Sequence, residues 1–212
     1  AMRQGLPDRN VLELLTGLGL ASAAGLNAYI PLLALGLLSR YTDLVTLPPG
    51  WAWLENGWLL IALGVLLLID VVADKIPAVD SVNDVIQTLV RPASGGIVFA
   101  SGAGSETVAI ADPGTLFAEG RWIPVALGIV IALVVHLTKA GVRPAANVAT
   151  AGMSAPVLST AEDAASVSLV AAAILVPLLV VVALIPLVIG AVWLWRRKRR
   201  RSAAENVLPS RS

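Results

Sequence analysis

Four aspartates and a lysine lie within the short stretch IDVVADKIPAVDSVND, which begins at Ile69. Asp70 and Asp74 are four residues apart, as are Asp80 and Asp84, and this spacing places each pair on one face of a helix. Paired carboxylates can bind a cation, relay a proton or hold Mg²⁺ against a phosphate group. The stretch directly follows the apolar run WLLIALGVLLL. The chemistry of these acids therefore depends on whether they lie inside a membrane.

The composition is that of a polytopic membrane protein. The chain has 212 residues, of which 57% are hydrophobic and only 14% charged, and its mean hydropathy is +0.83. A soluble domain carries about 25% charged residues. The apolar residues fall into runs of roughly 15–30, the length that crosses a bilayer. Without cysteine and with a single histidine, His136, the chain cannot build a thiolate or multi-histidine metal site.

The expected fold is an all-α membrane helix bundle with about six transmembrane segments arranged as three helical hairpins. Its apolar stretches are residues 11–38, 58–72, 94–111, 122–137, 144–158 and 166–195. If all six cross, most Lys and Arg fall on one side, as the positive-inside rule requires. Both termini are then cytoplasmic, and Glu162 and Asp163 lie in an external loop. Segments 94–111 and 144–158 are short and rich in small residues, so a re-entrant alternative stays open for them.

The chain is expected to form one transmembrane domain, residues 11–195, between a cytoplasmic N-terminal segment, 1–10, and a basic cytoplasmic tail, 196–212. The tail begins with a cationic run from Arg196 to Arg201, directly after the aromatic pair of Trp193 and Trp195. Aromatic residues followed by cations are typical of a cytoplasmic membrane exit, where they contact anionic lipid headgroups. We therefore expect lipid partners and no nucleic acid, and leave a homo-oligomer open.

An internal repeat accompanies this layout. The run ALGVLLLIDVVADK, ending at Lys75, aligns without gaps on ALGIVIALVVHLTK, ending at Lys139, and each is followed by Arg-Pro-Ala, at Arg91 and Arg143. The first, third and fifth stretches are rich in Gly, Ala and Ser, which let helix backbones approach closely in membranes. These stretches are expected at the centre of the bundle, and the aliphatic ones are expected to face lipid.

Polar residues inside this apolar frame are the candidate site. Counted from Trp58, Asp70 lies about 18 Å deep and Asp74 about 24 Å. Because unpaired charges at such depth are costly, partners are needed, and Lys139 and His136 lie at similar depth. Asn27 stands in GLNAYIP, where proline can break a helix and expose backbone groups. A cytoplasm-facing polar cavity formed by Asp70, Asp74, His136, Lys139 and Asn27 is therefore predicted to bind an ion or small substrate, with no metal ion or other cofactor.

The second pair of aspartates has a plainer interpretation. Asp80 and Asp84 lie on the polar face of a predicted short helix, residues 80–90, whose opposite face is apolar, as in helices that lie along a membrane surface. In an alternative interpretation, Asp70, Asp74, Asp80 and Asp84 hold Mg²⁺ on a phosphorylated lipid.

Three stretches carry a family resemblance: GLNAYIPLLALGLLSRY, DVVADKIPAVDSVNDVIQTLVRPASGG and VRPAANVATAG. They resemble bacterial inner-membrane proteins grouped as the domain-of-unknown-function 4126 family, over about residues 11–195. The resemblance implies a membrane location and brings no catalytic residues.

The first functional hypothesis is a small transporter or channel for an ion or small solute. The alternatives are a lipid-phosphate-handling protein, a flippase or transferase using Mg²⁺, and a non-catalytic membrane scaffold. The chain shows no hydrolase signature, so an enzyme is the less favoured class.

Overall fold

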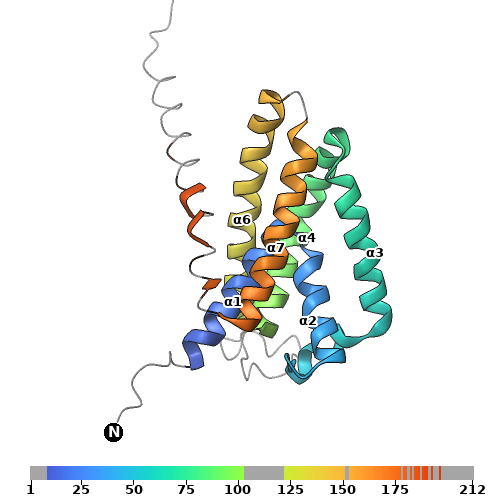
Figure 1. Ribbon diagram of the computed structural model, residues 1–212. Helices are drawn as coiled ribbons and strands as arrows, with labels where there is room; N and C mark the ends of the chain where they lie inside the picture. The colour runs from blue at the N-terminus through green and yellow to red at the C-terminus, as the bar shows by residue number, and fades with distance from the viewer. Residues whose placement is uncertain are drawn as a thin grey trace, which may run out of the picture.

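The computed structural model describes residues 9–102, 122–150 and 153–177, with single residues of the last segment between Leu179 and Arg196. Segment 94–111 beyond Gly102, residues 151 and 152 of segment 144–158, the tail after Arg196 and the side chain of Asp80 lie outside the described residues. The described part is all helical, as expected. Its elements are α1 (Arg9–Leu26), α2 (Tyr29–Tyr41), the 3₁₀ helix η1 (Pro49–Glu55), α3 (Gly57–Ala73), α4 (Pro77–Gly102), α6 (Trp122–Ala149) and α7 (Ser154–Leu175) (Figure 1).

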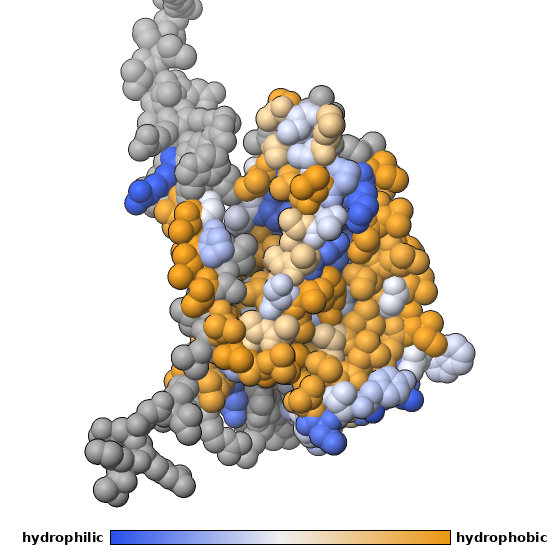
Figure 2. Space-filling model, viewed as in Figure 1, coloured by the Kyte–Doolittle hydropathy of each residue, from blue (hydrophilic) through white to orange (hydrophobic). Residues whose placement is uncertain are grey.

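Two of the described helices are long and apolar enough to cross a membrane, namely Trp122–Pro144 of α6 and Ser154–Leu175. A third span is added if η1 and α3, which are bent by 62° at Asn56, count as one. The flank of the bundle around α3 is covered by apolar side chains (Figure 2). A surface of this kind is stable against lipid and not against water, which supports a membrane location.

The first apolar stretch does not cross as one helix, contrary to the expectation for residues 11–38. α1 ends at Leu26, α2 begins at Tyr29, and the two helices run in opposite directions. α1 is antiparallel to α7, because Thr16 donates to the Ala173 carbonyl and Ser166 donates to the Ala23 carbonyl, both at 3.0 Å. α2 returns antiparallel to α3, toward the end of the bundle where α1 began (Figure 1).

The residues at this break explain it. The side-chain oxygen of Asn27 accepts hydrogen bonds from the backbone N–H groups of Tyr29, at 3.0 Å, and Ile30, at 3.3 Å. This is the chemistry of a helix N-cap. Pro31 then falls in the first turn of α2, where its missing N–H costs nothing. Asn27 and Pro31 are therefore the start signal of a new helix.

The predicted interfacial helix at residues 80–90 is also wrong, because it is the first part of α4. Val85 and Leu89 of its apolar face are 71% and 79% exposed, whereas Gln87 of its polar face is 1% exposed. The polar face therefore turns into the bundle and the apolar face turns outward. Periodicity identifies the two faces, but in a lipid environment it does not say which one is buried.

Prolines do not end the two long helices. α4 continues through Pro92 and α6 through Pro144, as membrane helices can when neighbouring groups satisfy the freed backbone. Segment 144–158 is therefore divided: its first residues complete α6, and its last begin α7 at Ser154. The predicted arrangement of three hairpins with a separate crossing at 144–158 is corrected accordingly.

Small residues bring α4 and α6 into close contact. A Cβ atom on Gly95 would meet the Gly128 carbonyl oxygen at 2.7 Å, and one on Gly128 would overlap Gly95. α1 packs against α4, α6 and α7, and its residues Leu20–Ala24 are fully or almost fully buried. The first stretch and the described part of the third thus lie at the centre, as their composition predicts. The fifth does not, because Val148 and Val157 are 85% and 70% exposed.

The last segment runs parallel to α6. Leu184 and Val188 lie with Val130 and Val134 around one cavity, and Val192 lies near Thr138. α1 also runs in this direction, so Arg9 and Arg196 lie toward opposite ends of the bundle. This disagrees with the expectation that both termini share the cytoplasmic side.

Candidate functional site

A buried cluster of charges joins α3, α4 and α6 inside the bundle. The Asp74 carboxylate, which follows α3, lies 3.2 Å from Lys139 Nζ, 3.2 Å from Arg143 Nη2 and 3.7 Å from Arg91 Nη2. All four side chains are almost completely buried. A single carboxylate therefore contacts three cations in a region of low dielectric, where charges are stable only if they are paired.

Glu162 on α7 completes this cluster. Its carboxylate lies 2.9 Å from Lys139 Nζ and forms a short ion pair with Arg143. Lys139 and Arg143 are each held between Asp74 and Glu162, so the charged side chains bind α7 to α6 and to the end of α3.

Asp70 is held by amides. Its carboxylate accepts hydrogen bonds from Asn27, at 3.2 Å, Asn83, at 2.6 Å, and Gln87, at 2.8 Å. The Asn83 amide also donates to Asp74, at 2.8 Å, so the two aspartates of the i, i+4 pair share one donor. The amide of Asn27 donates in addition to Asp163 on α7, at 2.9 Å.

The broken helix supplies further polar groups at the same place. The carbonyls that α1 and the break leave free accept hydrogen bonds from cations and a hydroxyl: Arg91 donates to Gly25, at 3.5 Å, and Lys139 to Leu26, at 3.3 Å. Ser94 donates to the Ala28 carbonyl at 2.6 Å. Cations at a helix C-terminus are favoured by the helix dipole. The break and the ion cluster therefore form one connected network.

His136 joins the network through α4. Its Nδ1 lies 3.4 Å from Arg91 Nη1, and its Nε2 lies 3.0 Å from Thr88 Oγ1. Because arginine only donates, Nδ1 must accept. Thr88 uses its own proton on the Asp84 carbonyl, at 2.8 Å, so it accepts from Nε2–H. This hydrogen-bond pattern requires a neutral imidazole with its proton on Nε2.

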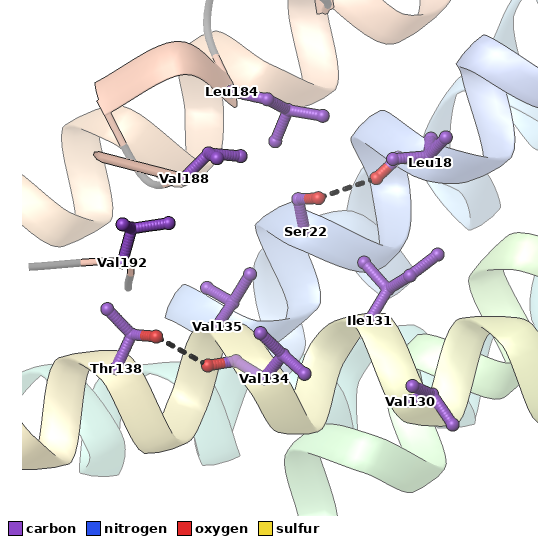
Figure 3. A pocket seen from close by; sticks show the side chains of 10 residues that line it. All are labelled: Leu18, Ser22, Val130, Ile131, Val134, Val135, Thr138, Leu184, Val188 and Val192. Atoms are coloured by element: carbon purple, nitrogen blue, oxygen red, sulfur yellow. Dashed lines mark hydrogen bonds between the residues drawn. The ribbon is translucent and has the colours of Figure 1, made fainter. Parts of the chain in front are cut away.

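Two cavities lie near the network. One, of about 340 Å³, is lined by aliphatic side chains of α1, α6 and the last segment, and the hydroxyls of Ser22 and Thr138 turn away to their own helix carbonyls (Figure 3). The other, of about 370 Å³, lies along α7 and reaches the network at Glu162. None of the five predicted site residues lines either cavity, so the open vestibule stays a prediction.

A comparison with known protein families shows to which family the chain belongs. The model of a family described as a domain of unknown function, DUF4126, matches residues 14–197 of the 212. The chain belongs to the DUF4126 family. The match includes every residue of the network just described and confirms the resemblance seen in the sequence. No curated protein and no solved structure matches the chain.

In this DUF4126 chain, all five residues predicted to form the site lie in one network. Asp70 and Asn27 are bonded to each other, Asn83 links Asp70 to Asp74, Asp74 pairs with Lys139, and His136 is joined through Arg91. Their predicted role in binding is a separate matter and stays a prediction.

The alternative magnesium site is not assembled among the described residues of the DUF4126 chain, which hold no group of three or more carboxylate or histidine side chains suited to a metal ion. The Asp84 Oδ1 atom is buried without a hydrogen-bond partner. The side chain of Asp80, the fourth proposed ligand, lies outside the described residues.

Sequence reasoning missed several members of the network: Arg91, Arg143, Asn83, Gln87 and Glu162. The arginines carried a signal, because each precedes a proline after one copy of the repeat. Asn83 and Gln87 carried another, since their i, i+4 spacing marks the polar face of α4. Glu162 was placed in an external loop, which is wrong, because it lies within α7 and pairs with buried cations.

Replacing Asn27 by alanine should destabilise this DUF4126 protein more than a normal cap loss would. The change removes the cap of α2 and leaves Asp70 and Asp163 without a shared donor, for an expected loss of about 2–4 kcal/mol, obtained by adding a cap to a buried hydrogen bond. The matched control is Asn56→Ala, which removes the exposed cap of α3, with bonds of 2.9 and 3.3 Å to Trp58 and Leu59, and should cost about 1 kcal/mol. Equal losses of unfolding free energy in detergent would contradict the bridging role.

Proposed function

We propose that this chain is an integral membrane transporter or channel for an ion or small solute, and that the buried network is its binding and gating site. One observation carries the proposal. A helix broken at Asn27 inside an apolar bundle presents its two ends to a cluster of ion pairs contributed by the end of α3 and by α4, α6 and α7. Broken helices whose ends meet charges are how many transporters build ion and substrate sites in the bilayer.

Energetics support a functional role for these charges. Ionisable groups inside a membrane cost several kcal/mol each unless they are paired, and a well-packed aliphatic core would hold the helices together without that cost. Burying the Asp70 carboxylate together with its amide partners carries the same kind of cost. A site that must exchange one partner for another during transport gives these groups a reason to be present.

We place the end of the bundle near Lys75 and Arg143 in the cytoplasm of a bacterial inner membrane. Lys75, Lys139, Arg143 and Arg196 gather toward this end, whereas α1 and α2 have Arg9 and Arg40 at the other. The positive-inside rule favours this orientation. It puts the basic run from Arg196 to Arg201 against anionic headgroups, with the start of α1 on the opposite side.

Asp70→Asn should abolish flux while the fold persists. An asparagine has the size of aspartate and keeps one oxygen for the amides of Asn83 and Gln87, but it removes the charge. Flux of protons and of small ions is measured in proteoliposomes, with thermal unfolding as the check on folding. Asp43→Asn, which changes an exposed aspartate, is the control and should retain flux. Normal flux in the Asp70 variant for every species that the wild type carries would overturn the proposal.

A non-catalytic scaffold is the second candidate, because Asp70 has three amide donors and lines neither cavity. It is preferred if the wild type carries no ion or solute at all and Asp70→Asn changes only stability.

A further inference from the structure

Glu162 is more exposed than the two cations with which it pairs. Its side chain is 16% exposed, whereas those of Lys139 and Arg143 behind it are 2% and 4% exposed. The exposed part faces the cavity of about 370 Å³, whose other lining residues are Leu26, Leu158, Ala161, Ala165, Ser168, Leu169 and Pro186. We call this cavity the α7 groove. Glu162 thus stands between the α7 groove and two buried cations.

The two cations behind Glu162 have a second carboxylate partner in Asp74. Asp74 lies within 4 Å of Arg91, Lys139 and Arg143, so it is already shared among three cations. Glu162 supplies the second carboxylate, at 2.9 Å from Lys139. If its carboxylate swings away, Lys139 and Arg143 each lose one carboxylate partner. Buried cations that lose a partner attract a replacement anion strongly, and carboxylate and phosphate groups match an Arg–Lys pair in geometry.

The remainder of the α7 groove is apolar. Leu158, Ala161, Ala165 and Leu169 recur at helical spacing and form one stripe along α7. Leu26 and Pro186 face this stripe from the end of α1 and from the last segment. The groove has the volume of an ordinary small-molecule pocket. An acyl or alkyl chain suits such a lining, whereas a hydrated inorganic ion gains nothing from it.

We propose that the α7 groove binds a single-chain amphiphile with a carboxylate or phosphate head, and that Glu162 is the displaceable internal anion that occupies the head position when the ligand is absent. This rests on the proposed function and names the substrate class of the same site. The head replaces the Glu162 carboxylate on Lys139 and Arg143, and the chain lies along the α7 stripe. Displacement of Glu162 releases the ion pairs that hold α7 against α6, which couples binding to movement.

The test measures binding to the full chain in nanodiscs of neutral phosphatidylcholine, as the shift in thermal unfolding with added decyl phosphate. The wild type should be stabilised only at high ligand concentration, because Glu162 competes. Glu162→Gln removes the competitor without changing its size, and should lower the half-saturating concentration about tenfold or more. Glu55→Gln, a glutamate of η1 at the other end of the molecule, is the matched control and should leave it unchanged.

Two further ligands and one further variant distinguish the contribution of the charged head of the ligand from that of its alkyl chain. Inorganic phosphate and 1-decanol should each fail to stabilise Glu162→Gln at the concentrations where decyl phosphate acts. Adding Ala165→Trp fills the groove and should abolish the response to decyl phosphate. If inorganic phosphate matches decyl phosphate, the site takes free anions and the amphiphile is wrong; if 1-decanol matches it, the role of the cations is wrong.

Separate controls test whether the variants fold and whether the protein transports. If Glu162→Gln does not fold, Ala165→Trp in the wild-type chain carries the test, and a retained response to decyl phosphate there overturns the proposal. Loss of decyl phosphate binding together with Asp70-dependent flux refutes this inference alone. If Glu162→Gln tightens decyl phosphate binding but the protein shows no flux, transport is refuted and the proposed ligand site is retained.

Discussion

Asp74→Asn should lower the free energy of unfolding by about 3–5 kcal/mol, the cost of removing one partner from a buried ion pair. The variant removes the carboxylate that Arg91, Lys139 and Arg143 share, whereas Glu162 still pairs with Lys139 and Arg143. The loss is measured by chemical or thermal unfolding in detergent. Asp43→Asn, at an exposed aspartate of the α2–η1 connection, should change stability by less than about 0.5 kcal/mol.

A double-mutant cycle shows whether the loss comes from unpaired cations. Lys139→Met in the Asp74→Asn background removes one cation from the cluster and should recover part of the stability, because a buried ion pair can be replaced by apolar groups at little cost. A double variant as unstable as the sum of the two single variants would show that Asp74 acts through something other than its charge.

Gly128→Leu should prevent α4 and α6 from packing and give a protein that is strongly destabilised or not recovered as a single species. A Cβ atom at Gly128 would meet the carbonyl of Gly95 and, at 2.6 Å, the Cβ of Phe99. Overpacking a core costs about 1–3 kcal/mol or more, and here backbone must move. The readouts are size-exclusion behaviour and thermal unfolding in detergent.

Gly64→Leu is the matched control, since a Cβ at Gly64 has nothing within 4 Å. It lies on α3, whose outward face is apolar, and a leucine there replaces a poor helix former by a good one. We expect the Gly64 variant to be as stable as the wild type or slightly more stable. Similar behaviour of the two leucine variants would contradict the close α4–α6 crossing.

The class of the fold was predictable because the amino-acid composition of a protein reflects whether lipid or water surrounds it. Residues 57–73 are almost all aliphatic, and α3 exposes many of them, including Ile61 and Leu68, in one contiguous apolar surface that is costly in water. The order of crossings was not predictable from charge counting, which took residues 11–38 as one span. Asn27 and Pro31 marked the start of a new helix, but hydropathy alone does not distinguish a crossing from a pair of helices that enters and returns.

The candidate site was predictable to the extent that depth could be counted along a helix. Counting placed Asp70, Asp74 and Lys139 at similar levels, and the structure joins them. The members contributed by α7 could not be found in this way, because the level of Glu162 depended on the assumed number of crossings. Gln87 was missed for another reason: the polar face of α4 was assigned to water, although in a membrane protein the interior can be the more polar side.

The break at Asn27 also constrains how the protein is made. α1 and α2 leave the ribosome before α4 and α6, but the groups that bind the free carbonyls near the break lie on these later helices: Arg91 on α4 and Lys139 on α6. Until those helices exist, the tip of the α1–α2 pair has unsatisfied backbone groups that hydrocarbon cannot accommodate. The α1–α2 pair can therefore settle at its final depth only after α6 has been inserted, and until then it must wait at the membrane surface or in a protected channel.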